Sequence, residues 1–210
     1  MVQNIENIVG EGRFRQIFRI NQGECVKVLK PKLVKHYGSL KVNFPLYWYA
    51  LLKYGVSDLN EFELLNYRRL MKGLPSNASQ FFAPILDVYQ DGPISVSLCQ
   101  LVVNSDGAVS PSLKQFGVVK DPYFWKAVDY VRTILIDRGL PYFGVHDRNI
   151  VVQEENRKLK PVFVDYKKFG ARMFPFQPWL YFQNAAHAKI DRSFADLDVI
   201  IPCLASQRLA

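Results

Sequence analysis

A lysine stands inside an apolar stretch near the start of the chain, where Lys27 lies between Val26 and Val28. Side chains alternate between the two faces of a strand, so Lys27 points away from the face that both valines share, and that face should be a cleft. An ammonium group on a half-buried strand needs an anionic partner, because burying an unpaired charge is costly. Glu63, on a later helix, is a ready partner, and the pair would hold the phosphates of a nucleotide. Lys27 taken alone could equally be a surface lysine on an edge strand.

Two glycines precede this strand. Gly10 and Gly12 are separated by one residue and open an expected β-hairpin. Glycine has no Cβ, so the backbone at these positions can approach a polyphosphate closely. The Gly-x-Gly pattern is weak by itself, because an ordinary tight turn also explains it. In the phosphate-covering loop of nucleotide-binding hairpins a third glycine follows, and here that position is Arg15.

Two polar residues stand at the ends of short apolar runs in the second half of the chain. Asn149 begins the run 149–152, and Asp165 ends the run 161–165. If the runs form a hairpin, the amide and the carboxylate meet at one end of it. Oxygen ligands of this kind suit Mg²⁺ that bridges phosphates. The alternative is that both residues only cap turns.

The elements expected around these residues follow one another as strands, helix, strands, helix and a pair of short strands. That order indicates an α+β fold, divided near Asn104. The expected elements are strands at Arg13–Ile20, Cys25–Leu29, Ile85–Tyr89 and Ile94–Val103, a helix from Leu59 to about Met71 between Asp58 and Gly73, and a helix from Asp121 to Gly139. Residues 32–57 form an aromatic-rich insertion, and the tail should be helical from about Asp191.

The composition favours a folded protein that binds anions. The 210 residues are 49% hydrophobic, which is enough for a sizeable core, and no run of about eighteen apolar residues suggests a membrane span. The N-terminus lacks the pattern of a signal peptide, and Cys25, Cys99 and Cys203 read as reduced thiols, so we expect a cytoplasmic protein. The net charge of +8 suits a nucleotide, a nucleic acid or an anionic membrane face. Nucleic acid is the less favoured partner, because no motif of a nucleic-acid-binding protein is present.

Taken in chain order, the glycine pair, lysine, helix glutamate, asparagine and aspartate resemble the protein-kinase-like fold. More narrowly, the sequence resembles the YrbL family, which is associated with the PhoP regulatory network of Gram-negative bacteria. The matching stretches are Val9–Arg15, Cys25–Val28, Phe62–Tyr67, Asp106–Gly107 with Ser110–Leu113, Asn149–Ile150 and Val164–Asp165. The resemblance implies a bilobal fold, with a small antiparallel β N-lobe at 1–103 and a truncated, mainly helical C-lobe at 104–210.

The resemblance also implies ATP and Mg²⁺ as ligands and a role for each matched residue. The implied nucleotide-binding residues are Gly10 and Gly12 over the phosphates, Lys27 on the phosphates, Glu63 as the partner of Lys27, and Val102 and Val103 beside the adenine; the implied metal pair is Asn149 and Asp165.

The sequence departs from the kinase pattern at the catalytic loop. The base aspartate should lie five residues before Asn149, and Gly144 stands there. His146 and Asp147 are the remaining candidates for catalysis in this loop. The third residue of the Asp-Phe-Gly motif is Lys167, and the 45 or so residues after Asp165 are too few for the helices that dock a peptide substrate.

Two hypotheses remain open. One is an atypical kinase that phosphorylates a small molecule or a glycan, with Asp147 as a substitute base. The other is a pseudokinase that binds nucleotide and acts on a regulatory partner protein through its shape. The alternative of a different class is a non-enzymatic protein that binds nucleic acid or an anionic surface through its basic charge.

Overall fold

A computed structural model describes residues 8–12, 15–30, 55–56, 58–91, 94–140, 145–166, 188, 191–192 and 194–195. Gly144, Lys167, Cys203 and nearly all of the insertion at 32–57 lie outside the described residues.

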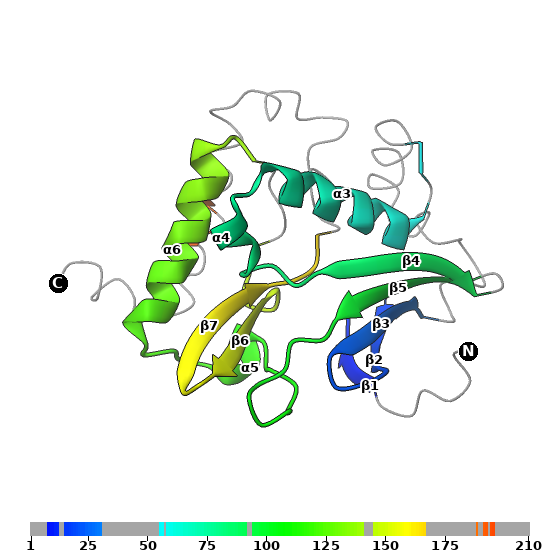
Figure 1. Ribbon diagram of the computed structural model, residues 1–210, viewed down its shortest axis with the longest axis horizontal. Helices are drawn as coiled ribbons and strands as arrows, with labels where there is room; N and C mark the ends of the chain where they lie inside the picture. Colours follow the sequence, from blue (N-terminus) through cyan, green and yellow to red (C-terminus); the bar gives the residue numbers. More distant parts are fainter. Residues whose placement is uncertain are drawn as a thin grey trace.

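The first part of the chain forms a five-stranded antiparallel sheet (Figure 1). Its strands are β1 (Ile8–Glu11), β2 (Arg15–Arg19), β3 (Glu24–Leu29), β4 (Ile85–Asp91) and β5 (Ile94–Gln100), in the order β1-β2-β3-β5-β4. Gly10 pairs with Ile17, and Ile17 pairs with Lys27, so these three residues form one row across β1, β2 and β3. This register brings the glycine hairpin next to the lysine strand.

The strand expected at Ile94–Val103 is shorter than the sequence predicts, because β5 ends at Gln100. Beyond it the chain leaves the sheet: the Leu101 amide donates to the carbonyl of Gly23, and Val103 pairs with Val109 in an isolated bridge. The apolar run continues past the strand because Leu101 is buried in the core rather than because the sheet continues.

Helix α3 (Leu59–Gly73) packs against β4 and β5. Asp58 starts it, because its carboxylate accepts hydrogen bonds from the amides of Asn60 (2.8 Å) and Glu61 (2.9 Å). The same carboxylate oxygen accepts from the Ser95 hydroxyl of β5 at 2.8 Å. The helix start is therefore fixed to the sheet as well as capped. Gly73, expected to terminate the helix, is its last residue.

Replacing Asp58 with alanine should lower the free energy of unfolding by about 1–2 kcal/mol, since the helix loses its cap and Ser95 loses an acceptor. Urea unfolding measures the change. Asp58→Asn, which keeps an oxygen acceptor at the N-cap, should recover most of the loss. Equal stability of Asp58→Ala and the wild type would contradict this role for the cap.

The second part of the chain contains helix α6 (Pro122–Asp137) and the hairpin β6 (Ile150–Glu155) and β7 (Lys158–Phe163). In the view of Figure 1 the hairpin lies between α6 and the five-stranded sheet, and α6 packs against β7. Two one-turn helices, α4 (Ser76–Ser79) and α5 (Leu113–Phe116), were not predicted from the sequence. Four residues are too few to give a helical hydrophobic period.

One hydrophobic core joins both parts. It includes Cys25 and Cys99 of the sheet, Leu70 of α3, Val128 of α6 and Phe163 of β7. The fold is therefore α+β, as predicted. In the part of the chain that the structure describes, no helix has the length and apolarity needed to span a bilayer.

Candidate functional site

A cavity of about 740 Å³ lies between the glycine hairpin, β3, the end of β5 and the start of β6. Its volume is in the range of small-molecule sites, roughly 300–1,000 Å³. Seven of the residues singled out from the sequence line it: Gly10, Gly12, Lys27, Val102, His146, Asn149 and Asp165. Glu63, Val103 and Asp147 are not in its wall. The topology therefore gathers most of the predicted site, from both halves of the chain, around one space.

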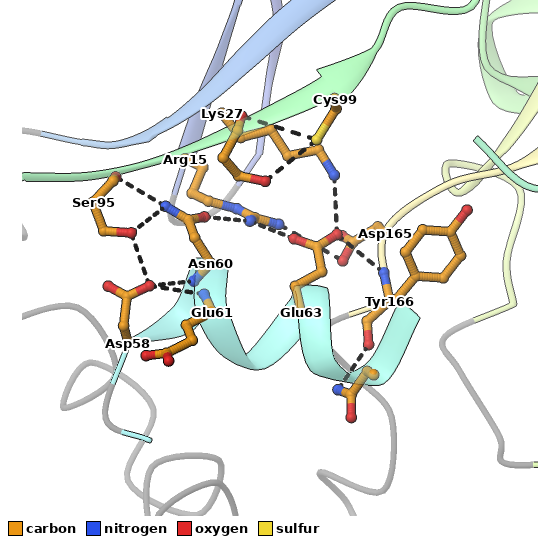
Figure 2. A network of polar contacts seen from close by, with 12 residues as sticks. Arg15, Lys27, Asp58, Asn60, Glu61, Glu63, Ser95, Cys99, Asp165 and Tyr166 are labelled. Atoms are coloured by element: carbon orange, nitrogen blue, oxygen red, sulfur yellow. Dashed lines mark hydrogen bonds and ion pairs between the residues drawn. The ribbon is translucent and has the colours of Figure 1, made fainter. Parts of the chain in front are cut away.

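Lys27 and Glu63 form the ion pair predicted from the sequence. Lys27 Nζ lies 2.9 Å from Glu63 Oε1, and the Glu63 side chain has no exposed surface (Figure 2). Glu63 therefore lies behind the cavity and holds the ammonium group at its wall. Burial alone lowers the pKa of Lys27, but the anionic groups around it outweigh burial and raise that pKa. The lysine remains charged.

Arg15 is a second cation on the same carboxylate, and the sequence analysis did not predict this role. Its Nη1 forms an ion pair with Glu63 Oε2 and donates to Asn60 Oδ1 at 2.7 Å. Its Nη2 lies 3.9 Å from Asp165 Oδ1. The residue is 4% exposed and lines the cavity. The alternation of side chains along the strand could have indicated this role. Arg15 and Ile17 are two residues apart on β2, and Ile17 pairs with Lys27, so all three side chains lie on the same face of the sheet.

Helix α3 supports this cluster with a polar stripe of Asn60, Glu63 and Asn66, all three with no exposed surface. The three residues are spaced by three positions, so they lie on one side of the helix. Asn60 Nδ2 donates to the Ser95 carbonyl at 2.9 Å. Asn60 thus orients the Arg15 guanidinium from one side while being fixed to β5 on the other. Polar residues at a spacing of three positions, next to the apolar residues of the same helix, were the sequence signal for the network.

The segment after β7 is bound to the same helix. The Tyr166 amide donates to Glu63 Oε1 at 3.1 Å, and Asn66 Nδ2 donates to the Tyr166 carbonyl at 3.1 Å. Asp165 has φ +69°, a left-handed conformation that is uncommon for residues other than glycine, although aspartate adopts it more readily than most, and that occurs at functional sites. The fixed Tyr166 backbone holds Asp165 in this conformation, next to the cavity.

The Tyr166 ring anchors the segment from the other side. Its hydroxyl lies 2.9 Å from the Ala83 carbonyl and 2.8 Å from the Phe163 carbonyl, and the residue is 1% exposed. Tyr166→Phe should lower the free energy of unfolding by about 1–2 kcal/mol, because it removes the one hydroxyl proton that the Ala83 and Phe163 carbonyls share. Chemical denaturation measures it. Tyr123→Phe removes a hydroxyl from a ring that is 77% exposed and should change stability little; equal losses in both variants would contradict the anchoring role.

Asn149 and Asp165 meet at one end of the β6–β7 hairpin, as the sequence predicts. Ile150 pairs with Phe163, and the Val164 amide donates to the Asn149 carbonyl at 2.9 Å. Both side chains line the cavity. An amide and a carboxylate oxygen fit Mg²⁺ chemically. No group of three His, Cys, Asp or Glu side chains in the described ranges could hold a metal, so phosphate and water oxygens would have to complete the coordination shell.

The glycine hairpin borders the cavity through Gly10 and Gly12, and the expected adenine-binding segment borders it through Val102. The Gly12 amide donates to the Arg15 carbonyl at 2.8 Å, so it closes the β1–β2 turn. Val102 lines the cavity, whereas Val103 does not, and the Val103 carbonyl accepts a hydrogen bond from Gln153 Nε2 at 2.9 Å.

Cys25 and Cys99 also line the cavity and are free thiols. Burial raises the pKa of Cys25 to about 12, so it stays protonated.

The loop before Asn149 offers little to a proton transfer. Asp147 is outside the cavity wall, and its Oδ1 lies 3.8 Å from His146 Nδ1, beyond a hydrogen bond. His146 lines the cavity, but its Nδ1 accepts from the Arg148 amide at 3.2 Å. In the neutral ring the proton is then on Nε2, which makes His146 a donor to phosphate or backbone oxygen rather than a base.

Comparisons with known proteins found similarities of structure and none of sequence. No known protein family matches the chain, and neither does any curated protein. Among solved structures, the chain is similar to a double mutant of the PknI kinase domain of Mycobacterium tuberculosis, with 14% sequence identity and a TM-score of 0.42. The match covers 77% of this chain and 58% of that one, so the chain spans less than two thirds of the length of that kinase domain.

Proposed function

We propose that this chain binds a nucleotide such as ATP in the cavity, as a kinase-like protein. The observation that carries the proposal is the buried Glu63, which holds Lys27 at the cavity wall and also binds the backbone beside Asp165. One carboxylate thereby positions a phosphate-binding cation next to a metal-binding anion. The same pairing of parts recurs in phosphoryl-transfer proteins. The resemblance of the sequence motifs to the YrbL family agrees with it.

The cavity offers distinct surroundings for the two ends of a nucleotide. Ala83, Ile85, Leu101 and Val102 supply apolar side chains for a base. Lys27 and Arg15 supply positive charge for phosphates. Sites of this kind are mostly apolar with a few convergent polar groups, so the lining matches an amphiphilic ligand.

Asn149 and Asp165 would hold Mg²⁺ when a nucleotide is bound. The ion would neutralise charge on the phosphates. The pairing of β6 with β7 keeps Asn149 and Asp165 at the same end of the hairpin, and the hydrogen bond of the Tyr166 amide to Glu63 fixes the backbone next to Asp165. Within the described residues of the loop at 145–149, no carboxylate lies in the cavity wall to accept a proton. We therefore expect nucleotide binding with very slow or no phosphoryl transfer, which favours the pseudokinase hypothesis over the kinase with Asp147 as base.

Two measurements on the purified full chain test the proposal. Calorimetric titration with ATP, in Mg²⁺ and in EDTA, should show saturable one-to-one binding in at least one condition. Single-turnover assays with labelled ATP should show hydrolysis near the uncatalysed background, and Asp147→Asn should not lower it. Absence of ATP binding in both conditions would refute the proposed function. Turnover that falls in Asp147→Asn would instead restore Asp147 as a catalytic residue.

A further inference from the structure

Arg15 is the feature of the site that the kinase pattern does not account for. It stands where a phosphate-covering hairpin has its third glycine, but its side chain is buried beneath the sheet rather than exposed on the hairpin. Figure 2 shows it extending from the strand toward Glu63 and Asp165. It places a permanent positive charge inside the cavity wall, beside the residue best suited to hold a metal.

The position of this charge is fixed by its partners. One guanidinium nitrogen, Nη1, is shared by Glu63 and Asn60, which are three residues apart on α3. Asn60 is itself bonded to Ser95 of β5. With Nη1 anchored on the helix, Nη2 is the nitrogen that faces Asp165, at 3.9 Å from its Oδ1.

The charges of the cluster balance without a metal. Arg15 and Lys27 carry two positive charges, and Glu63 and Asp165 carry two negative charges. Arginine keeps its proton at any ordinary pH, and although burial opposes its charge, Glu63 and Asp165 raise the pKa of Arg15 further. A divalent cation bound to Asp165 would lie close to the guanidinium, and like charges at short range in a poorly solvated site oppose each other.

We propose that Arg15 takes over part of the role of the metal ion: its guanidinium pairs with Asp165 when no nucleotide is bound and binds the phosphates directly when one is, so that nucleotide affinity depends only weakly on Mg²⁺. The proposal rests on the proposed function. Because Nη1 is held by Glu63 and Asn60, Nη2 is the nitrogen that would donate to a phosphate oxygen. A charge-assisted hydrogen bond of this kind is stronger than a neutral one, which supports the choice of a polyphosphate as the ligand.

The experiment is a calorimetric ATP titration of the full chain in Mg²⁺ and in EDTA, for wild type and Arg15→Gln. Wild-type Kd should differ by less than about threefold between the two conditions. In EDTA, Arg15→Gln should bind ATP at least about tenfold more weakly, and Mg²⁺ should restore much of that loss because Asp165 is then open to the ion. Arg157→Gln, an exposed arginine at the β6–β7 turn, is the matched control and should behave as wild type.

A second variant keeps the test decisive if Arg15→Gln folds poorly. Asp165→Asn retains both cations and removes only the charge that faces Nη2, so affinity in EDTA should rise as the guanidinium is released toward the phosphates. A fall in that affinity, or a wild-type gain of tenfold or more from Mg²⁺, would overturn the proposal for Arg15 while leaving nucleotide binding intact. No ATP binding by the wild type in either condition would refute the proposed function, and the proposal for Arg15 with it.

Discussion

Glu63→Gln is expected to destabilise the fold by about 3–5 kcal/mol, the largest loss of stability we predict for a single substitution in this chain. Glu63 is fully buried and pairs with Lys27 and Arg15 together. Glutamine keeps the shape but not the charge, so two buried cations would face each other with Asp165 as the anion nearest to them. The Tyr166 amide would also lose a charged acceptor. Urea denaturation followed by circular dichroism measures the free energy of unfolding.

Glu61→Gln is the matched control for this variant. Glu61 is on the same helix, two residues away, but its side chain is exposed. Removing its charge should change stability by less than about 0.5 kcal/mol. A Glu63→Gln protein as stable as Glu61→Gln would show that the buried carboxylate is not the centre of the network.

Lys27→Met is expected to weaken ATP binding by about 2–5 kcal/mol, the largest functional effect. The ammonium group lies at the cavity wall, and methionine fills a similar volume without the charge. The fold should survive, because Glu63 keeps its ion pair with Arg15. Two cations on one carboxylate thus allow binding and stability to be separated. A competition assay with a fluorescent ATP analogue measures the affinity.

Lys72→Met provides the control for Lys27→Met, since it removes one exposed positive charge from α3. Its ATP affinity should equal that of the wild type. If both variants lost affinity equally, the net charge of the protein rather than a site would account for binding. A folded Lys27→Met protein with unchanged affinity would exclude Lys27 as a phosphate ligand.

Local patterns were sufficient to predict most of the elements around the site. Alternation in Val26-Lys27-Val28 and the helix that starts after Asp58 predicted both sides of the Lys27–Glu63 pair correctly. The hairpin that joins Asn149 to Asp165 followed from two short apolar runs with polar ends. Each of these features depends on residues that are close in the sequence or that share one face of a single element, so it can be predicted without knowledge of the tertiary structure.

The rest of the site depends on contacts between distant segments. Arg15 departs from a glycine pattern in the sequence, and only the long-range contact of its side chain with α3 and the segment after β7 makes it a partner of Glu63 and Asp165. Aspartate tolerates a left-handed backbone, but the hydrogen bond that holds the next residue, Tyr166, to Glu63 of α3 is a long-range contact that the local sequence does not predict. Asp147 could be named from its spacing to Asn149, but its position outside the cavity wall is set by the loop conformation.

Hydrogen exchange of the full chain, with and without saturating ATP, tests the central claim most directly, because it locates the ligand without altering any residue. Binding in the cavity predicts slower exchange at amides of 9–12, 25–29, 100–103 and 163–166, and little change in α6. The same ATP added to Lys27→Met should give little protection. Protection confined to segments outside the cavity, or no protection at concentrations that saturate binding, would contradict the assignment of this cavity as a nucleotide site.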